Sequence, residues 1–115
     1  MNTLYIIKDE TDGNSFKPFV AIAKSKTSAD YFVEQRRQKV PTYAQKLIQY
    51  EPMKVDDFDP NKTHVYVIFD KSDGKNKSFD MRFDFQNAEQ LVRSKKAKLP
   101  HYAQKLVFTR MEKLI

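Results

Sequence analysis

The chain has 115 residues, of which 40% are hydrophobic and 31% charged, and this composition is typical of a folded globular protein rather than a disordered one. It contains no Cys, which excludes disulfides, thiolate zinc sites and cysteine nucleophiles. The net charge of +6 favours nucleic acid or an acidic protein surface as partner, although a lysine-rich composition set by a biased genome would give the same balance.

The first apolar run, Leu4 to Ile7, is followed at once by charged residues, so it lacks the layout of a signal peptide. No apolar run approaches the length of a membrane span. These features predict a cytoplasmic protein without a membrane partner. A homodimer is a further alternative.

The first predicted element is a β-strand over residues 5–7, where β-branched and aromatic residues follow one another. Its residues are apolar on both faces, which is typical of a strand that is covered on both sides. A similar run, Val65 to Phe69, occurs in the second half of the chain. An Asp-Gly pair follows each run and predicts a hairpin turn.

A second strand is clearest over residues 78–86, where apolar and polar residues alternate. Asp80 and Asp84 would share its wet face with Arg82 between them, which predicts a surface ladder of ion pairs. The corresponding run in the first half carries Val20 and Ile22 where the second half has Asp80 and Arg82. These two positions are either covered by another element or form an exposed apolar patch.

A helix follows each second strand. Thr27 or Ser28 and, in the second half, Asn87 are the expected N-caps. Pro41 and Pro100 are expected to end the helices. The residues at positions i, i+3 and i+4 form one apolar stripe on each helix: Ala29, Phe32, Val33 and Ala88, Leu91, Val92.

The pentamer YAQKL follows each proline, at residues 43–47 and 102–106. It predicts either a short helix that begins at the proline or a strand that begins at its last residue, and the β-branched and aromatic residues that follow favour the strand. In either case two tyrosines and two leucines should be packing anchors and two lysines should be in solvent: Tyr43, Leu47, Tyr102, Leu106, and Lys46, Lys105.

This order of elements predicts an α+β fold built from tandem duplicated ββα(β) units, with a largely antiparallel sheet and two main helices. The two repeats, residues 1–57 and 58–115, are expected to share one core about a pseudo-twofold axis within a single domain, residues 1–115. Val55 to Asn61 is the expected joint.

No constellation of catalytic groups is present. His64 and His101 have no paired nucleophile, and there is no Gly-rich phosphate loop, so we expect no enzyme, no catalytic residue and no cofactor. Asp56, Asp57 and Asp59 lack the spacing of a calcium loop. They predict a solvated acidic linker rather than a metal site.

Positive charge is concentrated in the second half. Residues 1–57 have nine Lys or Arg against eight Asp or Glu, and residues 58–115 have twelve against seven. Cations at a helix C-terminus also complement the helix dipole, but that alternative explains neither the hairpin lysines nor the asymmetry. The predicted phosphate ligands are Lys75, Lys77, Arg93, Lys95, Lys96, Lys98, Arg36, Arg37 and Lys39.

The sequence therefore predicts a small non-enzymatic protein that binds nucleic-acid phosphates through a basic stripe in repeat two. The alternative is a protein-binding inhibitor or adaptor, of the kind that mobile elements encode, acting through Val20 and Ile22.

Overall fold

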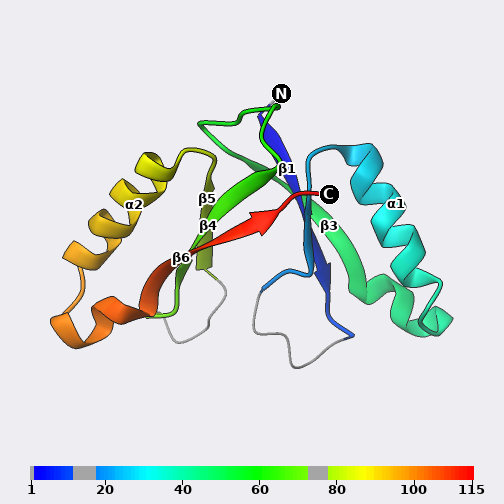
Figure 1. The fold of residues 1–115 in the computed structure, drawn as a ribbon. Helices are drawn as coiled ribbons and strands as arrows, with labels where there is room; N and C mark the ends of the chain where they lie inside the picture. The colour runs from blue at the N-terminus through cyan, green and yellow to red at the C-terminus, as the bar shows by residue number, and fades with distance from the viewer. Residues whose placement is uncertain (1, 12–17, 73–77) are drawn as a thin grey trace. The chain divides into compact units, whose positions relative to one another are not determined.

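Each half of the chain builds a small antiparallel sheet around a strongly apolar strand. The computed structural model describes residues 2–11, 18–72 and 78–115. It divides into two units: unit 1 is Met1–Lys54 with Leu114–Ile115, and unit 2 is Val55–Lys113. Figure 1 shows that each unit has one long helix beside its own strands.

Unit 1 has a three-stranded antiparallel sheet in the order β2-β1-β3, with α1 packed on it. Ile7, Ala29 and Val33 lie in the core between the helix and the sheet. Leu4 and Ile6, on the other face of the central strand, are also buried. The elements are β1 (Thr3–Asp9), β2 (Ala21–Ala23), α1 (Lys26–Arg37), the 3₁₀ helix η1 (Thr42–Leu47) and β3 (Ile48–Lys54).

Unit 2 has the same order of elements, and its sheet is β5-β4-β6. Ala88 and Val92 of the helix pack on Ile68 and Val107 of the sheet. The expected α+β fold with antiparallel sheets, two main helices and apolar helix stripes is confirmed. The elements are β4 (His64–Asp70), β5 (Ser78–Arg82), α2 (Phe85–Ala97), η2 (His101–Leu106) and β6 (Val107–Lys113).

The helices begin earlier than expected, and the expected caps are wrong. The side chain of Ser25 accepts a hydrogen bond from the backbone N–H of Ser28, and Asp84 accepts from Gln86 and Asn87. Both caps have extended backbone, which is the usual geometry for this position. Asp84 is therefore a cap and not part of a strand, so the predicted ion-pair ladder with Arg82 does not form.

The predicted alignment of the second strands is also wrong, by one residue. Ile22 pairs with Ile6, and Met81 pairs with Val67. Ile6 and Val67 are equivalent because each is the fourth residue of its central strand. Ile22 is therefore equivalent to Met81 and not to Arg82.

This shift decides between the two alternatives for Val20 and Ile22. Because side chains alternate across a strand, a one-residue slip exchanges the buried and the wet face. Ile22 is 1% exposed, as buried as its equivalent Met81, and Val20 is half-buried against the core of unit 1. These positions are covered, so the predicted exposed apolar patch is not present.

The repeated pentamer forms a 3₁₀ helix, and the strand starts only after it, at Ile48 and Val107. Both predicted alternatives thus occur, one after the other. The expected tyrosine anchors are wrong, because Tyr43 and Tyr102 are 80% and 77% exposed. The small side chain of the next residue, an alanine in both copies, is the buried one.

The expected solvated acidic linker is wrong for Asp57. Its carboxylate accepts hydrogen bonds from the backbone of Phe83 and Asp84 at 2.8 and 2.9 Å and from the side chain of Asn87 at 2.9 Å. Val55, the first residue of the expected joint, is 1% exposed. Burial acts to raise the pKa of Asp57, but these hydrogen bonds outweigh it and lower that pKa. Asp57 thus fixes the turn between β5 and α2.

Unit 1 contains a buried carboxylate at the end of its central strand. Asp9, at the end of β1, accepts a hydrogen bond from Arg36 Nε at 2.5 Å and two more from the backbone and hydroxyl of Thr11. Burial acts to raise the pKa of Asp9, but the hydrogen bonds of Thr11 and Arg36 and the charge of Arg36 together lower it. Asp70 makes the same turn with Ser72 but has no arginine partner in the described part of the chain.

We expect Asp9→Asn to lower the free energy of unfolding by about 1–3 kcal/mol at neutral pH, because it removes a charge-assisted hydrogen bond. The folded-state pKa of Asp9 is depressed, so its contribution is complete above the unfolded pKa of about 3.9 and is lost as the pH falls through the folded value. Urea unfolding at several pH values should show the two proteins converging in acid.

Asp70→Asn is the matched control and should cost less, since Asp70 forms no ion pair with the arginines and lysines that the structure describes. A wild-type advantage over Asp9→Asn that persists unchanged below the folded-state pKa would contradict this assignment.

Candidate nucleic-acid interface

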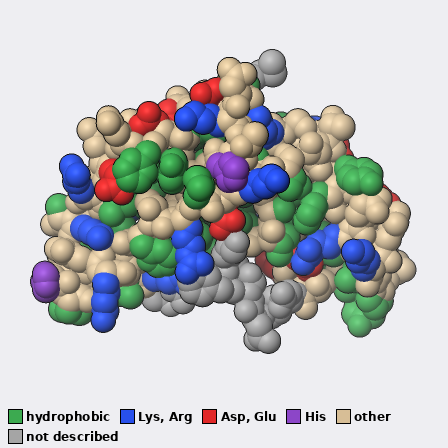
Figure 2. Space-filling model, in the orientation of Figure 1, with side chains coloured by type: hydrophobic (Ala, Val, Ile, Leu, Met, Phe, Trp, Pro, Cys, Tyr) green, Lys and Arg blue, Asp and Glu red, His purple; other side chains and the backbone are tan. Residues whose placement is uncertain are grey.

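The cations of unit 2 gather around the C-terminal end of α2. Arg93, Lys95 and Lys96 lie in its last turns, Lys98 is the C-cap residue, and η2 then adds Lys105. Residues 85–106 contain five Lys or Arg against one Glu, a net charge of +4. Figure 2 shows Lys and Arg side chains spread over the surface where α2 and η2 lie.

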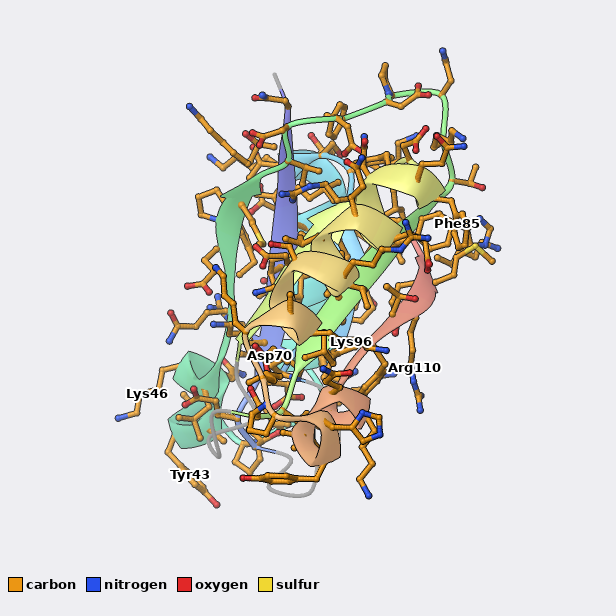
Figure 3. The ribbon with its side chains drawn as sticks, turned by 90° about the vertical axis from the view of Figure 1, so that its left-hand side faces the viewer. Tyr43, Lys46, Asp70, Phe85, Lys96 and Arg110 are labelled. Carbon is orange, nitrogen blue, oxygen red and sulfur yellow. The ribbon has the colours of Figure 1, made fainter. Side chains whose placement is uncertain are left out.

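The packing of α2 determines which of its side chains are available to bind a ligand. Ala88 and Val92 are turned into the core, and Leu91 packs partly against it. Arg93, one residue after a core position, is exposed, and Lys96 is half-buried toward the end of the helix (Figure 3). Pro100 then stops the helix, so that Lys105 comes from a separate short turn that packs on α2.

Four of these cations have no side-chain partner among the residues that the structure describes. Lys95 Nζ lies 3.2 Å from Asp80 Oδ2, so its charge is already paired. No other side chain in the described ranges forms an ion pair or a hydrogen bond with the remaining ones, which we call the free cations: Arg93, Lys96, Lys98 and Lys105.

The equivalent arginines of unit 1 are used differently. Arg36, equivalent to Lys95, is paired with the buried Asp9. Arg37, equivalent to Lys96, donates to the backbone carbonyls of Gln45 at 3.2 Å and of Ile48 at 2.7 Å. Both guanidinium groups are therefore engaged in holding α1 to its sheet and to η1.

The other predicted ligands fall in different places. Lys39 is exposed just after the end of α1. Lys75 and Lys77 lie outside the described residues. Lys105 was not among the predicted ligands because it belongs to the repeated pentamer, to which the sequence analysis gave only a structural role. Its spacing from Lys98 was the signal that could have found it, since the proline turns the chain back beside the helix end.

A groove of about 600 Å³ lies on unit 1 between α1 and β3. Asp30 and Glu34 line it together with Arg37 and Lys46, so its charge is mixed. The hydroxyl of Tyr50 donates to Asp30 at 2.6 Å within this groove. This mixture of charges suits an anionic ligand less well than the end of α2 does.

Comparison with protein-family models, curated proteins and solved structures gave no match for this chain. In the ranges that the structure describes, neither helix combines the length and the apolarity needed to cross a bilayer. The same ranges contain no cluster of three His, Asp or Glu side chains arranged to hold a metal ion.

The contrast between Arg37 and Lys96 predicts unequal costs of truncation. We expect Arg37→Ala to lower the free energy of unfolding by about 1–3 kcal/mol, because the carbonyls that it binds lose a charged donor. Lys96→Ala, the matched change in unit 2, should stay within about 0.5 kcal/mol of the wild type. Urea unfolding measures both, and equal losses would show that Lys96 has a structural role.

Proposed function

We propose that the protein is a small non-enzymatic nucleic-acid-binding protein and that unit 2 contacts phosphate groups through the four free cations. The observation that carries the proposal is that these four cations have no side-chain partner in residues 2–11, 18–72 and 78–115. Arg37 of unit 1, the equivalent of Lys96, is instead bound to backbone carbonyls. Unpaired cations that lie close together repel one another and hold counter-anions. A phosphate backbone would replace these anions with a gain in entropy.

The helix dipole accounts for only part of this arrangement. It favours cations in the last turn of α2, where Lys95 and Lys96 lie. Lys105 lies beyond the helix in η2, and Arg93 lies before the last turn, so neither is explained in this way. The dipole stabilises cations at this end of α2, but its own partial negative charge there opposes a bound anion, so any attraction of phosphate comes from the cations.

The composition of the site favours backbone contact over base recognition. Three of the four free cations are lysines, which act as point charges, whereas the bidentate recognition of guanine is best served by arginine. We therefore propose binding that depends strongly on salt and weakly on sequence.

We also infer that the two units derive from one duplicated ββα(β) unit, residues 1–57 and 58–115. The shared order of elements and the occurrence of YAQKL in both η1 and η2 support this inference. If the units are duplicates, unit 1 supplies matched control positions for unit 2.

Fluorescence anisotropy with a labelled RNA oligonucleotide and a labelled DNA duplex tests the proposal. Affinity should fall steeply as salt is raised from about 50 to about 200 mM. The site variant Arg93→Glu/Lys98→Glu/Lys105→Glu should bind more weakly. Its plot of log affinity against log salt should be shallower by about 2–3, the share of three lost phosphate contacts.

The matched control reverses the same number of exposed cations on unit 1: Lys26→Glu/Lys46→Glu/Lys54→Glu. It should keep the wild-type salt dependence. Two results would overturn the proposal. One is no binding by the wild type at about 50 mM salt, and the other is an equal change of slope in both variants, which would reflect net charge alone.

A further inference from the structure

Tyr102, the second residue of η2, is the most exposed aromatic side chain in the described part of unit 2. It is 77% exposed, whereas Phe85 is 54% exposed and Tyr66 is half-buried. No side chain in residues 2–11, 18–72 and 78–115 forms a ring contact or a hydrogen bond with Tyr102. The fold therefore leaves most of this ring in solvent.

The backbone that carries Tyr102 is held firmly. Pro100, whose ring restricts its own φ, precedes η2, and the N–H of Ala103 donates to its carbonyl at 2.9 Å. Ala103 is buried, and the side chain of Gln104 donates to the carbonyl of Leu99 at 3.4 Å. A ligand that packs on Tyr102 thus needs to restrict only the two side-chain torsions of the tyrosine, which keeps the entropic cost of binding low.

Lys105 lies on the same side of η2 as Tyr102. The two residues are three apart, and a 3₁₀ helix has three residues per turn, so their side chains lie one above the other. At a rise of about 2.0 Å per residue, their Cα atoms are about 6 Å apart along the axis. Figure 3 shows the equivalent pair of unit 1, Tyr43 and Lys46, pointing away from η1. A group stacked on Tyr102 would therefore lie within reach of an ammonium group.

Lys98 places a second cation near Tyr102. It is the C-cap residue of α2 and precedes Tyr102 by four residues, so their Cα atoms are at most about 14 Å apart. Lys98 and Lys105 are both exposed, and both belong to the free cations. In chain order an exposed ring thus stands between two cations. In a nucleic-acid strand each base likewise stands between two phosphates.

We propose that unit 2 binds single-stranded nucleic acid and that Tyr102 stacks on one of its bases while Lys98 and Lys105 hold the phosphates on either side. This inference rests on the phosphate binding proposed above and names the class of ligand. Stacking on an aromatic side chain tolerates any base, because every base has a π face. The weak dependence on sequence that we propose for the site is therefore preserved.

A duplex fits this arrangement less well than a single strand. Its bases are paired and stacked on one another, so the ring of Tyr102 meets no free base face unless a base is first taken out of the helix. In single strands and loops the bases can turn outward and stack on aromatic side chains. A duplex would thus be held by the free cations alone.

The equivalent tyrosine of unit 1 has a different electrostatic environment. Tyr43 is 80% exposed, and Lys46 follows it by three residues. Lys46, however, lines a groove together with Asp30 and Glu34. Glu34 takes the place of the free cation Arg93, since each follows the buried valine of its helix. These carboxylates oppose a phosphate near Tyr43, so Tyr43 is a matched control for Tyr102.

Fluorescence anisotropy with three labelled probes of equal length tests the proposal. The probes are a single strand of thymidines, the same strand with abasic sites in place of its bases, and a duplex. Tyr102→Ala should weaken binding to the thymidine strand by about 5- to 100-fold, the loss of one stacked base. Its affinity for the other two probes should not change, because neither offers a free base face. The slope of log affinity against log salt should also stay the same, because no phosphate contact is lost.

Two further variants separate stacking from other effects. Tyr102→Phe should keep the wild-type affinity for the thymidine strand, because it keeps the ring. Tyr43→Ala should bind that strand nearly as tightly as the wild type. Because both tyrosines are exposed, urea unfolding should give both alanine variants the midpoint of the wild type, which shows that any change in binding is not a loss of folding.

Wild-type affinity of Tyr102→Ala for the thymidine strand overturns the inference. An equal loss on all three probes does so as well, because the substitution would then have disturbed the cations. Equal losses from Tyr43→Ala and Tyr102→Ala overturn the assignment to unit 2. In these cases the wild type still binds the duplex and the abasic strand, so the proposed phosphate binding stands. A wild type that binds no probe at about 50 mM salt overturns both proposals.

Discussion

The register of each central strand against its two neighbours is the constraint on which the rest of the structure depends. Because side chains and backbone groups both alternate along a strand, a slip of one residue would exchange every buried side chain for an exposed one. The pairing of Ile22 with Ile6 places Ile22 in the interior. The pairing of Met81 with Val67 does the same for Met81 in unit 2. The strands β2 and β5 are followed directly by the N-cap residues Ser25 and Asp84, so the same registers also determine where α1 and α2 begin.

Equivalent positions then take different roles according to the partner that each finds. An arginine at the end of α1 reaches the carbonyl of Ile48, and its neighbour reaches the buried Asp9, so both charges stabilise unit 1. In unit 2 lysines stand at these positions. One pairs with Asp80 on the nearby strand, and the other, Lys96, has no side-chain partner in the described part of the chain. Lysine has a single cationic centre on a flexible stem and cannot reproduce a fork of two hydrogen bonds to carbonyls.

Much of the fold could be predicted from periodicity, because the apolar stripes of the helices and the central strands are strong local signals. The exposure of Tyr43 and Tyr102 could not be predicted in this way, because it depends on the 3₁₀ geometry, in which the alanine after each tyrosine is the buried residue. The alignment of Val20 and Ile22 failed because a short strand leaves register ambiguous until its partner is known. For the candidate interface, the sequence indicated the basic end of α2. Only the contacts in the structure show that Arg36 and Arg37 are engaged within unit 1, whereas Lys96 is not engaged by any side chain in the described ranges.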